Sequence, residues 1–198
     1  MRIRIGVTAI SAVMLTSGFF NMDSLILGRG TFYSVALPWD RVIPLEPSWI
    51  WAYLLYYPIC VSPLFFPKVL KNGRTFRGVM GGFLFQFALA WVVFYLFPTR
   101  IAHPAVPGST LSDAALRGLY RVDDGHLIFP CLHVANTLFV ALVSARLLPW
   151  RRSAPFFAAV LLVAASTLLT KQHLIVDLPA GAFLGYLAYR WIARPALA

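Results

Sequence analysis

Long apolar stretches recur along this chain of 198 residues, separated by short segments that carry most of the charge. The clearest stretch, GVMGGFLFQFALAWVVFYLF over 78–97, holds Gln86 as its only strongly polar side chain. A helix needs about 20 apolar residues to cross a bilayer. The pattern predicts an all-α fold, an integral membrane bundle of six transmembrane helices. Their expected ranges are 5–27, 48–66, 78–97, 128–147, 155–170 and 174–193.

The composition supports a membrane protein. The chain is 60% hydrophobic and only 12% charged, whereas a soluble domain has about twice that share of charge. No repeat or low-complexity segment interrupts it, so we expect one domain over 1–198. The N-terminal run lacks a small-x-small cleavage site, which predicts a retained first helix and not a cleaved signal peptide. Two cysteines, Cys60 and Cys131, are too few and too differently placed to predict a disulfide.

The charges sort by side of this predicted bundle. Segments on the side of the N-terminus carry 11 of the 17 basic residues and no acid. These basic residues are Arg2, Arg4, Lys68, Lys71, Arg74, Arg77, Arg146, Arg151, Arg152, Arg190 and Arg194. The seven acids and four histidines fall on or near the opposite side. The positive-inside rule therefore predicts a multi-pass protein of the cell membrane with both termini cytoplasmic. The net charge of +10 then reflects topology and contact with anionic lipid, and no nucleic-acid partner is expected.

Two histidines lie at borders of apolar segments, where ionisable groups are costly and usually functional. His173 and Asp177 are four residues apart in TKQHLIVD, and His133 follows in FPCLHVA after Cys131. A spacing of four predicts that Asp177 orients the His173 ring from one helix face. Two histidines, one with its own carboxylate, can supply the nucleophile and proton donor of phosphoryl transfer.

Three stretches of the predicted extracytoplasmic side converge on these histidines. They read FPTRIAHP, YRVDDGHLIFPCLHVANT and ASTLLTKQHLIVDLPAG. Arg100, Arg121 and Lys171 from these stretches could form an anion site beside His133 and His173. The two arginines could instead be interfacial anchors or headgroup contacts.

Other interpretations of the histidines stay open. His173 with Asp177 could be a structural capping pair, and His133 could simply bond a backbone carbonyl. Both histidines with Asp177 could form a two-histidine, one-carboxylate metal site, but no HExxH motif or further ligand cluster accompanies them. We therefore predict no metal and no cofactor. A thiol-phosphatase loop on Cys131 would need an arginine at position 137, which is Thr.

These residues resemble the signatures of the type 2 phosphatidic acid phosphatase superfamily, K-x6-RP, PSGH and SR-x5-H-x3-D. The third signature is matched by His173, Asp177 and Ser166, and the second by Pro130 and His133. FPCLH followed by STLLTKQH is similar to the branch of inositol phosphorylceramide synthases, which has a lysine at the position of Lys171. The resemblance covers most of residues 40–190.

The chain departs from these signatures at several positions. Thr167 stands at the arginine of the third signature, and Cys131 and Leu132 replace Ser and Gly of the second. In the first, only Pro104 matches, with His103 at the position of the arginine and Leu96 at that of the lysine.

The resemblance implies a membrane enzyme that hydrolyses a lipid phosphate ester through phosphohistidine at the extracytoplasmic face. His173 would attack phosphorus, Asp177 would hold its ring, and His133 would protonate the leaving oxygen and then activate water. The phosphate-binding residues would be Lys171, Arg100 and Arg121, with Cys131 and Ser166 at the serine positions of the signatures. Alternatives are a lipid phosphotransferase, in which an alcohol replaces water, and a non-catalytic binder or transporter of lipid phosphates. The expected partners are the lipid phosphate and the bilayer.

Overall fold

The computed structural model describes residues 30–198, and this part of the chain is built from helices. The expected span 5–27, with Arg2, Arg4 and Asp23, lies outside the described residues. The α-helices are α2 Ile50–Leu54, α3 Tyr56–Val61, α4 Pro67–Lys71, α5 Gly73–Leu96, α6 Leu111–Val122, α7 Leu132–Leu147, α8 Trp150–Leu169 and α9 Asp177–Leu187. A π-helix, Ala188–Ala193, and a 3₁₀ turn, Arg194–Ala196, continue α9. Further 3₁₀ turns are Pro38–Arg41, Pro47–Trp49 and Ser62–Phe65. Residues 30–198 form isolated β-bridges but no strand, so the all-α prediction is confirmed for them.

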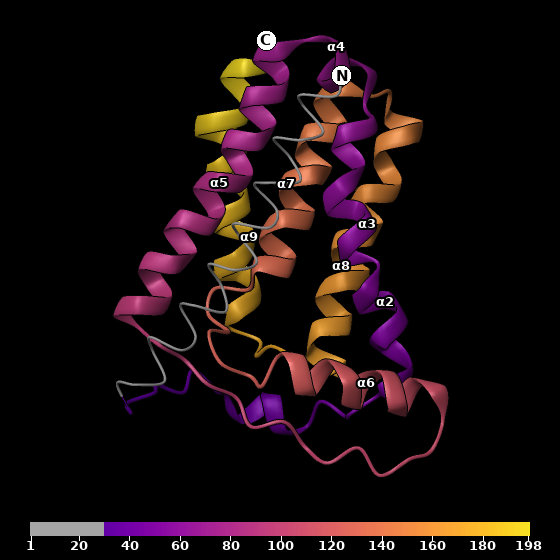
Figure 1. Cartoon of the computed structure of the whole chain (residues 1–198), viewed down its shortest axis with the longest axis vertical. Coiled ribbons are helices and arrows are strands. Elements are labelled where there is room, and N and C mark those ends of the chain that lie inside the picture. Colours follow the sequence, from indigo (N-terminus) through magenta and orange to yellow (C-terminus); the bar gives the residue numbers. More distant parts are fainter. Residues whose placement is uncertain (1–29) are drawn as a thin grey trace.

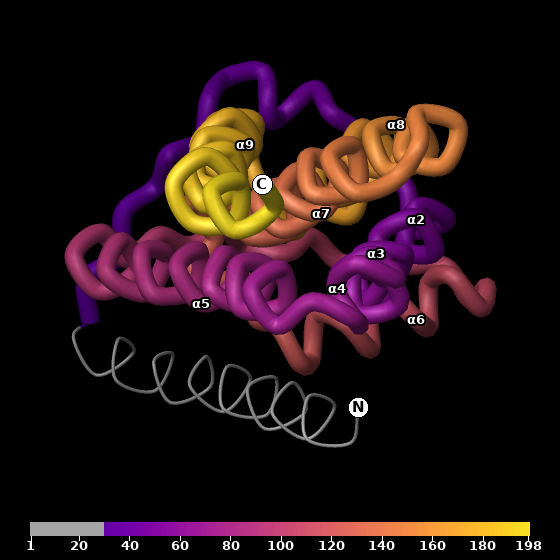
Figure 2. Tube along the Cα trace, turned by 90° about the horizontal axis from the view of Figure 1, so that it is seen from above, coloured from indigo at the N-terminus to yellow at the C-terminus, as the bar shows by residue number. Residues whose placement is uncertain are grey.

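The long helices form two layers. Viewed along the bundle, α9, α7 and α8 lie side by side in one layer, and α5 lies in the other with α2 to α4 (Figure 2). Helix α6 lies across one end of both (Figure 1). Among the described helices, α5 and α8 are long and apolar enough to cross a membrane, and α7 is a shorter apolar helix. The number of six spans remains a prediction.

The expected span 48–66 is a chain of short helices. Helix α2 ends at Leu54 and α3 begins at Tyr56. Pro58 has no N–H to donate to the carbonyl of Leu54, so the regular hydrogen-bond ladder is interrupted there. Pro63 similarly lies in the 3₁₀ turn that ends this segment. The segment therefore bends along the bundle.

Helix α6 was not expected from the apolar runs, because it is amphipathic and only 12 residues long. It begins with a capping box: the Thr110 hydroxyl accepts from the Asp113 amide, and the Asp113 carboxylate accepts from the Thr110 amide at 2.8 Å. Its buried face presents Leu116 to Ile50 and Tyr53 of α2. This contact closes one end of the bundle.

The described charges separate between the two ends as expected. The end that holds α4 and the C-terminus carries Lys68, Lys71, Arg74, Arg77, Arg146, Arg151, Arg152, Arg190 and Arg194 (Figure 1). The end that holds α6 carries the described acids and the histidines. Which end faces the cytoplasm remains a prediction.

Candidate active site

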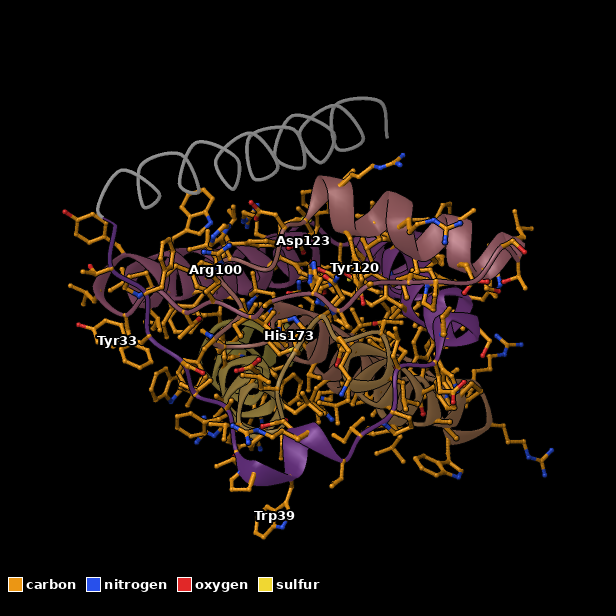
Figure 3. The ribbon with its side chains drawn as sticks, turned by 90° about the horizontal axis from the view of Figure 1, so that it is seen from below. Tyr33, Trp39, Arg100, Tyr120, Asp123 and His173 are labelled. Atoms are coloured by element: carbon orange, nitrogen blue, oxygen red, sulfur yellow. The ribbon has the colours of Figure 1, made fainter. Side chains whose placement is uncertain are left out.

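His133 and His173 meet at the α6 end of the bundle. His133 lies in the first turn of α7, and His173 lies in the loop between α8 and α9. The distance from His133 Nδ1 to His173 Nε2 is 3.1 Å, so the two rings share a hydrogen bond. His173 is buried near the middle of this end, whereas Trp39 extends from its rim (Figure 3).

A Schellman turn at the end of α8 places His173. The amides of Lys171 and Gln172 donate to the carbonyls of Leu168 and Thr167, at 3.1 and 2.9 Å. The His173 amide also donates to the Thr167 carbonyl, at 3.1 Å. Lys171 takes the left-handed conformation of such a turn, with φ 53°, where glycine is usual. The turn reverses the chain and directs His173 back toward α7.

Asp177 holds the other nitrogen of His173, as predicted, although no shared helix face is involved because α9 begins only at Asp177. Its Oδ2 lies 3.2 Å from His173 Nδ1 and accepts from the Leu174 amide at 2.7 Å. Burial lowers the pKa of His173, but the nearby Cys131 and Asp177 raise it, and it lies well above its ordinary value. A nucleophilic lone pair exists only in the singly protonated ring. With a proton on Nδ1, Nε2 is the nitrogen that faces His133.

The backbone joins the two histidine segments directly. The Cys131 amide donates to the Asp177 carbonyl at 3.1 Å. Cys131 is the N-cap of α7, and its sulfur accepts from the Val134 amide at 3.5 Å. Cys131 Sγ lies within 4.8 Å of one ring nitrogen of His133 and one ring nitrogen of His173.

Two tyrosines fix the other side of the His133 ring. The ring centroids of Tyr53 and Tyr56 lie 4.6 and 4.4 Å from that of His133. Asn136, one turn after His133, donates to the Tyr56 hydroxyl at 2.7 Å. The contact of these tyrosines with His133 was not predicted from the sequence, because aromatic side chains near a bilayer also form interface belts. The available signal was spacing: Tyr53 and Tyr56 are three apart, as are His133 and Asn136, which share a face of α7.

A cavity of about 490 Å³ opens beside the histidines and is lined by residues of α2, α3, α5, α6 and α7. Its wall includes His133, His173 and the buried Gln172. Most of the remaining lining is apolar, from α5 and the neighbouring helices, including Val79, Met80, Phe83, Phe87 and Leu132. A polar reacting centre thus adjoins space suited to a hydrocarbon chain.

The side chains of the expected phosphate-binding residues make other contacts than to the histidines. Lys171 Nζ donates to the carbonyls of Asp40 and Ile43, at 3.1 and 2.5 Å. Burial lowers the pKa of Lys171, and the nearby Asp40 partly offsets this. Lys171 therefore fastens the segment before α2.

The other expected phosphate ligands also have different surroundings. The Arg100 guanidinium is exposed and lies 6.0 Å from the centroid of the Phe32 ring. Arg121 is exposed on α6. The buried Ser166 hydroxyl donates to the Val163 carbonyl of its own helix at 2.7 Å. Of the predicted site residues, the structure thus brings together Cys131, His133, His173 and Asp177.

His103, at the arginine position of the first signature, supplies no charge near neutral pH. Burial lowers its pKa to about 4, against an opposing effect of Asp124. The centroid of its ring lies 3.9 Å from that of Tyr120, on which it stacks, and its Nε2 lies 3.2 Å from the side-chain nitrogen Nε2 of Gln172. Tyr120 in turn donates to the Thr170 carbonyl at 2.7 Å. These contacts fasten α6 to the loop that carries His173.

A helical bundle with paired histidines and a supporting carboxylate, beside an apolar cavity, defines the class of site expected for phosphoryl transfer on a lipid. The family model of the PAP2 superfamily matches residues 41–191. The chain belongs to this superfamily of type 2 phosphatidic acid phosphatases, whose members are phosphatases and related phosphotransferases. No curated protein and no solved structure matches the chain.

Proposed function

We propose that this protein hydrolyses the phosphate monoester of a membrane lipid through a phosphohistidine intermediate. The observation that carries the proposal is the 3.1 Å contact of His133 Nδ1 with His173 Nε2, with Asp177 on the opposite nitrogen of His173. Asp177 orients the His173 ring through Nδ1, which leaves Nε2 as the nucleophile, and His133 is within proton-transfer distance of the same reacting centre.

In the first half-reaction, His173 Nε2 forms a bond to phosphorus while the bond from phosphorus to the lipid oxygen breaks. Protonated His133 gives its proton to that oxygen, and the lipid alcohol leaves. Asp177 stabilises the positive charge that develops on the His173 ring. In the second half-reaction, His133 takes a proton from water, the water oxygen attacks phosphorus, and the N–P bond breaks to release phosphate.

The first turn of α7 provides donors for the phosphate oxygens. The amides of Leu132 and His133 lie in the first turn of α7, so no carbonyl of the same helix precedes them to accept their hydrogen bonds. The dipole of this 16-residue helix adds positive potential at the same end. Lys171, Arg100 and Arg121 stay proposed phosphate ligands, and reaching the histidines would require their side chains to leave the contacts described above.

The cavity favours a lipid over a soluble phosphate ester. Its lining by Val79, Phe83, Phe87 and Leu132 matches an acyl or prenyl chain, and it adjoins both histidines. The separation of charge between the two ends supports an extracytoplasmic side for the histidines under the positive-inside rule. We therefore propose a multi-pass protein of the cell membrane that acts on lipid of the outer leaflet.

Leaving-group dependence tests the two histidine roles. A lipid alkoxide needs a proton to leave, so His133→Ala should lower kcat/KM on a lipid phosphate by about 10²–10⁴. An aryl phosphate with an acidic phenol leaves unaided, so the same variant should recover much of its phosphorylation rate there. His173→Ala lacks the nucleophile and should fail on both substrates.

Single-turnover release of the phenol separates phosphorylation from the later hydrolysis, which also uses His133. Activity of His173→Ala on the aryl ester, combined with its loss in His133→Ala, would reverse the roles. Retention of lipid phosphatase activity by both variants would exclude this site. Adding an alcohol acceptor and measuring phosphorylated alcohol against free phosphate distinguishes transfer from hydrolysis.

A further inference from the structure

Cys131 adds a third possible ligand atom, a thiol sulfur, beside the two histidines of the candidate active site. Its sulfur lies within 4.8 Å of one ring nitrogen of His133 and one ring nitrogen of His173. The cysteine is fully buried, His173 is nearly so, and His133 is half-buried. The mechanism above uses both histidine nitrogens but has no use for the thiol.

The three atoms match the donor set and spacing of a tetrahedral zinc site. Zinc bonds of about 2.3 Å to sulfur and 2.0–2.1 Å to nitrogen place two nitrogens about 3.3 Å apart and sulfur about 3.6 Å from nitrogen. The observed N···N distance of 3.1 Å is close to this value. The S···N distances exceed the zinc value by about 1.2 Å at most, given the 4.8 Å limit.

The surroundings also match those of a metal site. A histidine that binds a metal usually donates its other N–H to a carboxylate, which fixes the ring and increases its basicity. Asp177 Oδ2 occupies this place, 3.2 Å from His173 Nδ1. Both histidines face the cavity, which leaves room for a fourth ligand such as water. Thiolate with imidazole favours Zn²⁺ and Cd²⁺ over Mg²⁺ or Ca²⁺.

We propose that Cys131, His133 and His173 bind a thiophilic divalent cation such as Zn²⁺, and that the bound ion inhibits the enzyme. On binding, the thiol loses its proton to solvent, and the proton of the Nδ1···Nε2 hydrogen bond is released to solvent or moves to Nε2 of His133. The metal then takes the lone pairs on Nδ1 of His133 and Nε2 of His173. The same lone pairs would otherwise attack phosphorus and carry the proton. The inhibition rests on the proposed function, whereas the binding of the ion does not.

Cobalt spectroscopy of the purified full chain in detergent tests binding independently of activity. Co²⁺ should give a thiolate-to-cobalt charge-transfer band and the intense visible bands of tetrahedral coordination, both removed by excess Zn²⁺. Cys131→Ser should lose the charge-transfer band and bind at least about tenfold more weakly. Cys60→Ser is the matched control, since Cys60 is a free cysteine on α3 outside the trio, and it should keep the band. Absence of the band in the wild type, or its loss in Cys60→Ser and not in Cys131→Ser, overturns the proposal.

Two further measurements test the metal site and its effect on activity. In Cys60→Ser, Zn²⁺ should protect the remaining thiol from an alkylating reagent, which tests the site without altering Cys131; unprotected alkylation contradicts it. Zn²⁺ should inhibit phosphate release reversibly, and the ratio of rates with and without Zn²⁺ should be closer to one in Cys131→Ser. A cobalt band in a protein that hydrolyses no lipid phosphate would retain the metal site and reject the proposed function. Full lipid phosphatase activity without any cobalt band would retain the proposed function and reject the metal site.

Discussion

Gly181 of α9 lies directly against the Cys131 carbonyl group at the start of α7. A Cβ atom added to this glycine would stand 2.2 Å from the carbonyl oxygen, closer than such atoms can approach. One turn later, a Cβ on Gly185 would stand 2.2 Å from the Ala135 carbonyl oxygen. The two glycines form a small-xxx-small pattern, which lets membrane helices pack closely. This contact brings the segment of His133 to that of Asp177.

Gly181→Ala and Gly185→Ala should therefore force α7 and α9 apart. We expect a loss of about 1–3 kcal/mol in the free energy of unfolding, as in overpacked cores. Because the shift also separates the histidines, kcat/KM should fall by more than tenfold. Gly118→Ala on α6 is the matched control, since its Cβ would meet nothing within 4 Å. It should be neutral or stabilise by up to about 1 kcal/mol. Equal Tm and kcat/KM in all three variants would contradict this packing.

Asp177→Asn should lower kcat by about 10²–10⁴ with little change in KM. An amide can still accept from the Leu174 amide, but it lacks the charge that stabilises the His173 ring when phosphorus is attacked. Asp124→Asn is a control for breaking a His–Asp contact, because Asp124 pairs with His126, 2.5 Å away. Steady-state kinetics should show a small effect of the control. Comparable losses in the two variants would mean that Asp177 acts only through stability.

The sequence predicted those parts of the molecule that depend on local pattern. The long apolar runs predicted α5 and α8, and the spacing of His173 and Asp177 predicted their contact. It did not predict α6, whose apolar residues are too few to form a run, although the Thr110–Asp113 capping box was readable.

The environment of the cations could not be predicted locally. Lys171 donates to the carbonyls of Asp40 and Ile43, which are more than a hundred residues away along the chain. Nothing in the neighbourhood of Lys171 in the sequence encodes this contact. Likewise, Tyr53 and Tyr56 contact His133 only because α2 and α3 fold against α7. Which of the tyrosines at 53, 56 and 57 contacts His133 depends on that packing.

Membrane orientation can be tested by cysteine labelling of intact cells in a Cys60→Ser background. Leu111 and Trp150 suit this test because these residues are 74% and 69% exposed and are the first residues of α6 and α8, which begin at opposite ends of the bundle. If the α6 end is extracytoplasmic, an impermeant maleimide should label Leu111→Cys and spare Trp150→Cys until the cells are permeabilised. The reverse pattern would invert the topology and place the histidines in the cytoplasm.

His103 should make stability depend on acid pH. Its pKa is about 4 in the folded protein and about 6.5 when unfolded. Between these values the unfolded chain binds more protons, so stability falls as pH drops from about 6.5 toward 4. His103→Gln keeps an acceptor for Gln172 without this titration, and its Tm should fall less between pH 7 and pH 5 than that of the wild type. An identical fall in both proteins would mean that His103 is not held neutral by its surroundings.

Two substitutions of Lys171 separate the effect of its backbone conformation on stability from the function of its side chain. Its φ of 53° suits glycine, whereas its ammonium group holds the Asp40 and Ile43 carbonyls. Lys171→Ala should lose about 1–2 kcal/mol through those hydrogen bonds. Lys171→Gly should lose less, because glycine removes about 1 kcal/mol of left-handed strain. The observed contacts thus predict a higher Tm for the glycine variant than for the alanine variant, whereas the proposed role of Lys171 as a phosphate ligand predicts an equal rise of KM for lipid phosphate in both. An unchanged KM in both variants would exclude Lys171 as a phosphate ligand, and equal Tm values would contradict the effect of its backbone conformation.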